Sequence, residues 1–364
     1  MHIPFCRSKC PYCDFNSYAG MEQLESKYVA ALLEHIRQTR QQIPFKFDTI
    51  FIGGGTPTAL SEPCLEQLLE GIRQLFPGSG SEFTMEANPK TLTPRKLELM
   101  LKKGVNRISI GLQAWQDELL KKIGRIHTAA DFLDSVNLAR AAGFTNINAD
   151  VMYQLPGQTL AHWEETLETL LALDLPHLSC YSLTIAEGTP FSRRLPAPLP
   201  DEDTEREMNH LAKNKLTKKG IFPYEISNFA KPGYECRHNL IYWKGEEYAA
   251  FGAGASGYLQ GVRYTWPHNP EEYIQKVYSK VLRPSQTEKV EDKLGEVLML
   301  RLRLTEGINR EEMEALYGAG CLLPYESIIQ RHLNNSLLQK TIKGFALTER
   351  GFDLANQVMC DFLA

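Results

Sequence analysis

The stretch Thr49-Ile-Phe-Ile-Gly-Gly-Gly-Thr-Pro57 is a short apolar run that ends in three glycines. A run of this length, bounded by turn-forming residues, predicts a buried strand over 49–52. Apolar residues at helical spacing flank it on both sides, from Leu24 to Ile36 and from Leu65 to Phe76. The stretch is therefore one strand in a chain where strands and helices alternate.

The same alternation continues to about residue 225. One helical segment lies between each pair of successive predicted strands, which are Glu82–Ala87, Ile108–Leu112, Asn146–Tyr153 and His177–Ile185. A run of βα units predicts a parallel sheet with right-handed connections. We therefore predict an α/β fold, a partial (β/α) barrel over 1–225, with functional residues at the carboxyl ends of its strands.

The remaining chain has a different character. Prolines interrupt the pattern between Pro190 and Pro200, a charged helix is expected over 202–219, and residues 226–286 form a connecting segment. Helices, a hairpin and a final helix predict a small winged-helix-like module over 287–364. This module has nine basic and twelve acidic residues, whereas a DNA-binding winged helix is normally basic. We therefore predict a structural module.

Composition excludes several classes of protein. The formal net charge of −4 gives no basic excess for nucleic acid or anionic lipid. No apolar run approaches the roughly 18 residues that a membrane-spanning helix needs. The 43% hydrophobic content is ordinary for a folded globular protein.

Three cysteines lie near the start, in the order Cys6-x3-Cys10-x2-Cys13. Eight cysteines are too few for a disulfide framework in 364 residues, so their crowding predicts metal binding in a reducing cytoplasm. Structural zinc needs four ligands, whereas a 4Fe–4S cluster on three thiolates leaves one iron open to a small molecule. From the residues alone, an incomplete zinc site stays open as an alternative.

Glycines and polar residues gather where the predicted strands end. Glycine lets the backbone approach a ligand closely, carboxylates suit hydroxyl or ammonium groups, and arginine suits a carboxylate. The alternatives are a plain tight turn for the glycines and ordinary surface or structural positions for the polar residues. The residues in question are Gly54, Gly55, Thr56, Glu86, Gln113, Arg125 and Asp150.

The cysteine spacing at the start of a βα chain, with Tyr12 before the last cysteine, resembles the radical S-adenosylmethionine (SAM) superfamily. In that superfamily the open iron binds the amino and carboxylate groups of SAM, and one electron cleaves its sulfonium to a 5′-deoxyadenosyl radical. The resemblance implies that Cys6, Cys10 and Cys13 hold a 4Fe–4S cluster. The SAM contacts that it implies are Tyr12, Gly54, Gly55, Thr56, Glu86, Gln113, Arg125 and Asp150, with Ser182 lining the same pocket.

Segments Glu86-Ala-Asn-Pro89, Ser109-Ile-Gly-Leu-Gln113 and Asp150-Val-Met-Tyr-Gln-Leu-Pro156 resemble one branch of the superfamily. That branch contains oxygen-independent coproporphyrinogen III oxidase and the HemW group of heme chaperones. The oxidase pattern has a fourth cysteine where this chain has Phe15, and a long segment ahead of its cluster. The stretch His238-Asn-Leu-Ile-Tyr-Trp243 matches the HNxxYW motif of the HemW group. We expect a heme chaperone, with the oxidase or another radical SAM enzyme as alternatives.

The HNxxYW stretch supplies the candidate heme residues, His238, Tyr242 and Trp243. Neutral imidazole can ligate heme iron, and the aromatic side chains offer flat apolar faces. Cys236 is a second candidate ligand, and a packed loop with buried aromatic residues is the alternative reading. The resemblance implies heme, an electron donor and a heme-acceptor protein as partners, with respiratory or membrane-associated proteins as candidate acceptors, and no nucleic acid.

One departure from the family pattern concerns the start. The pattern begins Tyr-x-His-Ile-Pro-Phe-Cys, whereas here Met1 occupies the x position. The tyrosine, an implied SAM contact, is absent from the sequence. We expect a short first strand, and either a start that lies upstream or a SAM site with one contact fewer.

Overall fold

One eight-stranded sheet dominates the fold. The computed structural model describes residues 1–42, 47–77 and 82–363. The strands are β1 (His2–Ile3), β2 (Thr49–Gly54), β3 (Glu82–Ala87), β4 (Arg107–Gln113), β5 (Asn146–Tyr153), β6 (His177–Ser182), β7 (Phe222–Pro223) and β8 (Asn228–Ala230). Their spatial order is β1-β2-β3-β4-β5-β6-β8-β7, so the sheet is open and has two edges, as a partial barrel requires.

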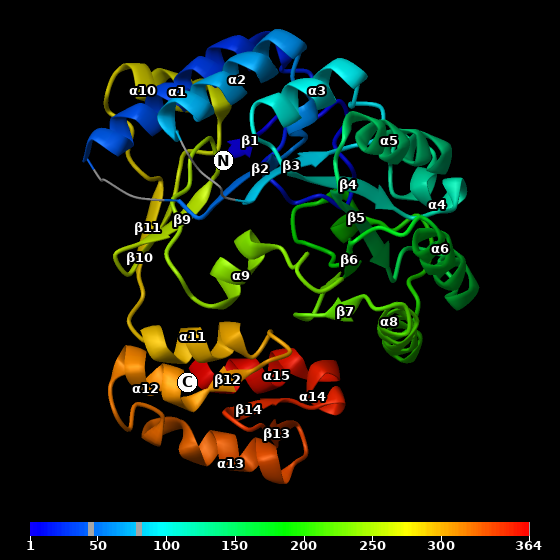
Figure 1. Ribbon diagram of the computed structural model, residues 1–364, viewed down its shortest axis with the longest axis vertical. Coiled ribbons are helices and arrows are strands. Elements are labelled where there is room, and N and C mark those ends of the chain that lie inside the picture. Colours follow the sequence, from blue (N-terminus) through cyan, green and yellow to red (C-terminus); the bar gives the residue numbers. More distant parts are fainter. Residues whose placement is uncertain (43–46, 78–81, 364) are drawn as a thin grey trace.

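Strands β1 to β6 pair in parallel, in the order in which they follow one another along the chain. Figure 1 shows the helices that connect them along the outer side of the curved sheet. These helices are α1 (Glu25–Gln42), α2 (Glu62–Leu75), α3 (Pro94–Lys102), α4 (Asp117–Lys122), α5 (Ala129–Ala142) and α6 (Leu160–Ala172). Helices α7 (Pro190–Arg193) and α8 (Glu202–Thr217) follow β6. The predicted α/β fold is confirmed.

Local sequence signals explain where several of these helices begin. Thr93 accepts a hydrogen bond from the backbone of Lys96 at the start of α3. Thr128 and Asp131 form the predicted capping box of α5, which ends at Gly143 with φ +111°. A left-handed residue at that position lets the chain leave the helix, and glycine adopts it without strain.

All five predicted strands pair in parallel, and two short strands that were not predicted add an antiparallel edge. Strand β8 pairs antiparallel with both β6 and β7. Only residues 224–227 connect β7 to β8, and a parallel pair needs a crossover of a dozen or more residues. Strand β6 also ends at Ser182 rather than at the predicted Ile185.

The connecting segment forms a small second sheet and packs back on the barrel. It contains α9 (Arg237–Trp243), β9 (Ser256–Leu259), β10 (Val262–Thr265), α10 (Pro270–Tyr278) and β11 (Gln286–Lys289). The three strands are antiparallel, in the order β11-β10-β9. Tyr273 of α10 meets Tyr28 of α1 with 5.4 Å between ring centroids, so this segment shares the core of the barrel.

The last part of the chain is a compact module with its own hydrophobic core. It consists of α11 (Lys293–Arg301), β12 (Ile308–Asn309), α12 (Arg310–Tyr317), α13 (Glu326–Asn334), β13 (Leu338–Lys340), β14 (Gly344–Leu347), α14 (Glu349–Asp353) and α15 (Ala355–Cys360). Its antiparallel sheet has the order β12-β14-β13. The helices and hairpin predicted here are present, but the final helix is divided at Leu354 into α14 and α15.

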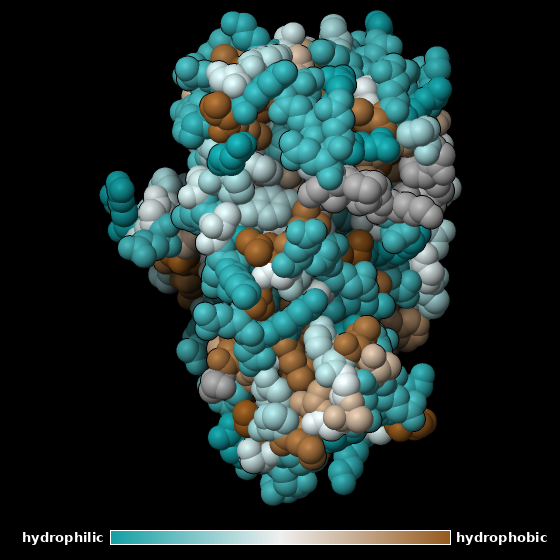
Figure 2. All heavy atoms as spheres, turned by 90° about the vertical axis from the view of Figure 1, so that its left-hand side faces the viewer, coloured by the Kyte–Doolittle hydropathy of each residue, from teal (hydrophilic) through white to brown (hydrophobic). Residues whose placement is uncertain are grey.

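Figure 1 places this module below the barrel, with α9 between the sheet and α11. Contacts between α9 and α11 join the two parts. Figure 2 shows that hydrophilic residues cover most of one face of the molecule, with hydrophobic residues scattered among them. Among the helices that the structure describes, none has the length and apolar character needed to span a membrane.

Candidate functional site

A cavity of about 350 Å³ lies at the carboxyl edge of the parallel strands. All residues predicted to hold the cluster or SAM line this cavity. They are Cys6, Cys10, Cys13, Tyr12, Gly54, Gly55, Thr56, Glu86, Gln113, Arg125, Asp150 and Ser182. The parallel βα topology explains this convergence, because the carboxyl ends of successive strands meet at one edge of the sheet.

The three cysteines occupy the loop that follows β1, and all three are half-buried free thiols. Cys6 Sγ lies 3.5 Å from Thr56 Oγ1, and Cys10 Sγ lies 3.8 Å from Arg125 Nη1. Burial raises the pKa of both Cys6 and Cys13. The Cys6 and Cys13 thiols are therefore protonated at neutral pH, and a metal that binds them must displace those protons.

The side-chain arrangement fits a polynuclear cluster better than a single zinc ion. Among the described residues, no three His, Cys, Asp or Glu side chains are arranged to hold one metal ion. A 4Fe–4S cluster distributes its thiolate ligands over separate irons, so its cysteines need only face a common space. The three thiols that border this cavity meet that requirement.

The glycine-rich end of β2 packs directly against the cysteine loop. A Cβ atom on Gly55 would lie 2.7 Å from Phe5 O and 3.0 Å from Cys6 Sγ. Gly54 has φ +115°, and its N–H donates to Glu86 Oε2 at 3.0 Å. A side chain at Gly55 would fill the space beside Cys6, and one at Gly54 would meet the His2 ring, so glycine at both positions allows the cysteine loop to pack closely on the end of β2.

Two carboxyl groups, Glu86 and Asp150, face the same cavity from β3 and β5. Burial, followed by repulsion from Asp150, raises the pKa of Glu86 to about 7. Burial also raises the pKa of Asp150, which accepts hydrogen bonds from Ser109 Oγ at 2.8 Å and Asn148 Nδ2 at 2.9 Å. Two buried acidic groups suit a ligand that carries positive charge.

Arg125 provides positive charge in the same cavity. Its Nη2 donates to Gly111 O at 3.0 Å and to Asn88 Oδ1, and its Nε donates to His127 Nδ1 at 3.3 Å. Burial lowers the pKa of His127 to about 4, so a neutral ring can accept this bond while Nε2 donates to Leu112 O. Within the described ranges Arg125 forms no ion pair with a carboxylate, which leaves its charge available to an anionic group.

Gln113, Tyr12 and Ser182 complete the walls. Gln113 has φ +75°. Residues other than glycine rarely adopt this conformation, and those that do are often found at functional sites. Tyr12 packs against Phe191 with 6.3 Å between centroids. Ser182 Oγ lies 2.8 Å from Gln154 Oε1 and 2.5 Å from Glu205 Oε1, so its hydroxyl is already engaged.

The HNxxYW residues lie elsewhere, on α9 at the amino ends of the strands. Glu82, the first residue of β3, accepts hydrogen bonds from the backbone N–H groups of Arg237 at 2.8 Å and His238 at 3.0 Å. His238 Nδ1 lies 2.7 Å from Thr49 Oγ1, whereas Gly54 at the other end of β2 borders the first cavity. Five residues of strand correspond to about 17 Å, and His238, Tyr242 and Trp243 do not line the first cavity. Gly54 also lines a further cavity of about 200 Å³ together with His238 and Tyr242.

His238 is held firmly in place. Its Nε2 lies 2.8 Å from the hydroxyl of Tyr242, and its ring stacks on Phe51 at 5.1 Å. Burial lowers its pKa to about 3, so the ring is neutral. Cys236, the other candidate ligand, is 0% exposed, hydrogen-bonds to Glu82, and has a pKa raised by burial to about 11. A buried, protonated thiol is a poor ligand for an incoming metal, which speaks against Cys236.

Several residues of the site were missed by the sequence reasoning. Asn88 touches both Arg125 and Thr56, and its position two residues after Glu86 at a strand end was the available signal. Below the cavity, Asn148 bonds to Asp150, to Ser109 and to His177, and His177 Nε2 lies 2.9 Å from Tyr224 OH. Asn148 and Ser109 lie within strands and His177 begins β6, positions where the sequence pattern alone indicates only core.

Comparisons with known proteins identify the chain's relatives. The family model of the radical SAM superfamily matches residues 1–170. The heme chaperone HemW of Bacillus subtilis (strain 168) is 40% identical over 374 residues, covering 100% of this chain and 98% of that protein. The heme chaperone HemW of Escherichia coli (strain K12) is 37% identical over 376 residues, covering 100% and 97%.

Among solved structures, coproporphyrinogen III oxidase (HemN) from Escherichia coli, a radical SAM enzyme, matches with a TM-score of 0.86. The match covers 99% of this chain and 88% of that chain at 20% identity, so it shows a common fold. The relatives named HemW are more similar in sequence and match from end to end. The chain belongs to the HemW family of heme chaperones within the radical SAM superfamily.

Proposed function

We propose that this protein binds heme and transfers it to an acceptor protein, and that it carries a 4Fe–4S cluster with bound SAM. The observation that carries the proposal is the full-length similarity to relatives named heme chaperone HemW. The separation of the HNxxYW residues from the cysteine cavity supports it, because a heme carrier needs a site from which heme can leave.

In this proposal Cys6, Cys10 and Cys13 hold the cluster. When bound, a 4Fe–4S cluster supplies single electrons and one iron without a protein ligand. The residues around it match the parts of SAM. Arg125 pairs with the carboxylate, and the buried carboxyl groups of Glu86 and Asp150 face the ammonium or ribose hydroxyl groups. Gly54, Gly55 and Thr56 contribute backbone groups, and Tyr12, Gln113 and Ser182 close the walls.

His238, Tyr242 and Trp243 are the proposed heme residues. A neutral imidazole is the form that ligates iron, and burial keeps His238 in that form. Both ring nitrogens are engaged, one with Thr49 and the other with Tyr242. Ligation by His238 therefore requires one of these two hydrogen bonds to be exchanged for iron.

The second candidate function is oxidation of coproporphyrinogen III, which the likeness to the Escherichia coli oxidase favours. That likeness concerns the fold. The position of the fourth cysteine in the oxidase pattern is here Phe15, which lines the cavity with 62% of its surface exposed. A radical enzyme must hold its substrate close to the reacting carbon and exclude water from it.

Anaerobic reconstitution followed by two parallel assays tests the proposal. Titration with heme should give a saturable spectrum, and coproporphyrinogen with SAM and a reductant should not be consumed. His238→Ala should weaken or alter heme binding while iron content stays the same. Conversion of coproporphyrinogen to protoporphyrinogen by wild-type protein, or a lack of heme binding, would overturn the proposal.

A further inference from the structure

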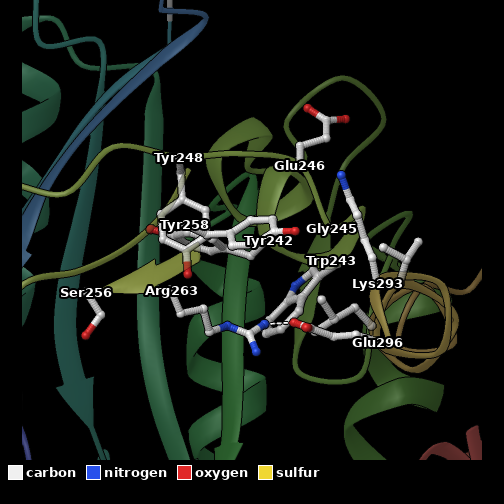
Figure 3. A pocket seen from close by; sticks show the side chains of 12 residues that line it. Tyr242, Trp243, Gly245, Glu246, Tyr248, Ser256, Tyr258, Arg263, Lys293 and Glu296 are labelled. Carbon is white, nitrogen blue, oxygen red and sulfur yellow. Dashed lines mark ion pairs between the residues drawn. The ribbon is translucent and has the colours of Figure 1, made fainter. Parts of the chain in front are cut away.

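A second cavity, of about 290 Å³, lies between the connecting segment and the C-terminal module. Tyr242 and Trp243 of α9 line one side, Tyr258 and Arg263 of β9 and β10 line another, and α11 closes it with Lys293 and Glu296 (Figure 3). It is near the lower end of the range of about 300–1,000 Å³ for ligand sites. A cavity of this size encloses part of a large flat molecule and leaves the rest exposed.

The aromatic lining suits a flat ligand. Tyr242 packs edge-on against Tyr248 with 4.5 Å between centroids, and Arg303 lies 4.2 Å from the centroid of Trp243. The indole Nε1 of Trp243 is buried and has no hydrogen-bond partner among the described residues. The wall therefore presents aromatic ring surfaces, and the indole donor of Trp243 lies buried behind them.

The two cations of the cavity suit carboxylates. Arg263 forms an ion pair with Glu296, and the two side chains are 41% and 12% exposed. Figure 3 shows this pair inside the cavity and Lys293 extending toward Glu246 at its border. Lys293 is exposed and has no ion pair within the described ranges. A ligand carboxylate can therefore compete with Glu296 for Arg263, and it can also meet the exposed Lys293.

We infer that this cavity binds the carboxylate-bearing edge of a tetrapyrrole, with Arg263 and Lys293 as partners of the two propionate groups. This inference deepens the proposed function and rests on it. Tyr242 connects the cavity to the proposed iron ligand, because its ring lines the wall while its hydroxyl lies 2.8 Å from His238 Nε2. The C-terminal module then has a role in binding, since α11 provides one wall.

The inference is testable because substitutions at the two residues of the ion pair should change heme affinity in opposite directions. Arg263→Gln removes a charged donor for a propionate and should weaken heme binding by about 10-fold or more. Glu296→Gln removes the carboxylate that competes for Arg263 and should strengthen heme binding several-fold. If the ion pair only stabilises the fold, both substitutions should weaken heme binding and also lower the melting temperature.

Lys293→Gln should weaken heme binding less than Arg263→Gln, because a lysine on the surface is more strongly screened by water. A matched control is the ion pair between Arg310 and Glu326, which lies in the C-terminal module outside the cavity. Arg310→Gln and Glu326→Gln should leave heme affinity unchanged. These controls separate loss of a local contact from a general loss of charge.

A ligand variant tests the inference on the wild-type protein, without any risk of misfolding. Heme and its dimethyl ester, in which both carboxylates are masked, are titrated in the same detergent. The ester should bind at least 10-fold more weakly. Equal affinity for heme and ester, or an unchanged affinity in Arg263→Gln, would overturn this inference and leave the proposed function standing. Failure of wild-type protein to bind heme at all would overturn the proposed function.

Discussion

Replacing Arg125 by alanine is expected to weaken SAM binding without removing the cluster. Three contacts, to Gly111 O, Asn88 Oδ1 and His127 Nδ1, fix the plane of the guanidinium through its Nη2 and Nε atoms. Its Nη1 makes a long contact of 3.8 Å with Cys10 Sγ. The proposed carboxylate partner therefore approaches a group that the protein has already oriented.

The expected magnitude follows from these contacts. A hydrogen bond to a charged group contributes roughly 1.5–3 kcal/mol, which corresponds to about 10- to 150-fold in affinity. Arg125→Lys retains the charge but loses the planar fork, so its effect should fall between wild type and alanine. The alanine variant also leaves the Asn88 amide oxygen without its donor, and a small fall in melting temperature is expected.

Equilibrium dialysis of SAM against the reconstituted protein under anaerobic conditions measures the effect, with iron content determined on the same samples. Arg95→Ala is the matched control, because Arg95 is an exposed arginine on α3 that pairs with Glu62 away from the cavity. Unchanged SAM affinity in Arg125→Ala, with normal iron content, would refute the assignment of Arg125 to the SAM carboxylate.

Three further outcomes are expected. Alanine at Cys6, Cys10 or Cys13 should abolish the broad iron–sulfur absorption, whereas alanine at the exposed Cys360 should not, and retention in all four variants would exclude this ligand set. Because the pKa of Glu86 rises from 4.5 to about 7 on folding, the stability that it contributes is complete below pH 4.5 and is lost as the pH rises through 7. Glu86→Gln should therefore raise the melting temperature of the cofactor-free protein more at pH 8 than at pH 5.5, and an equal change at both would contradict the shift. Thr128→Ala removes the capping box of α5 and should cost about 1 kcal/mol in denaturant unfolding, against little change for Thr145→Ala at an exposed position just after the same helix.

Much of the barrel could be predicted because each strand carries its own local signal. The strands Glu82–Ala87 and Asn146–Tyr153 have the predicted ends, and the capping box at Thr128 marks the start of its helix. Once the strands are parallel, their carboxyl ends share one edge. The convergence of the cysteines, the glycines and the polar residues in one cavity then follows from their positions along the chain.

Other features depend on contacts between distant segments. Strands β7 and β8 pair antiparallel because only a short connection joins them. In the sequence, neither strand differs from any other short apolar segment. The position of α9 depends on Glu82, which lies at the start of β3, more than 150 residues earlier in the chain. The Glu82 carboxylate accepts hydrogen bonds from the first backbone N–H groups of α9. The same packing buries Cys236, a burial that its neighbours in the sequence do not indicate.

The cysteine loop, the order of the βα units and the edge of the sheet that bears the site can be predicted from residue spacing and from the geometry of parallel strands. Long-range packing places the HNxxYW helix at the opposite edge and brings Arg263 and Lys293 into one cavity beside it. Those two cations are thirty residues apart and belong to different parts of the fold. Their proximity arises from the packing of α11 against α9, which no local pattern encodes.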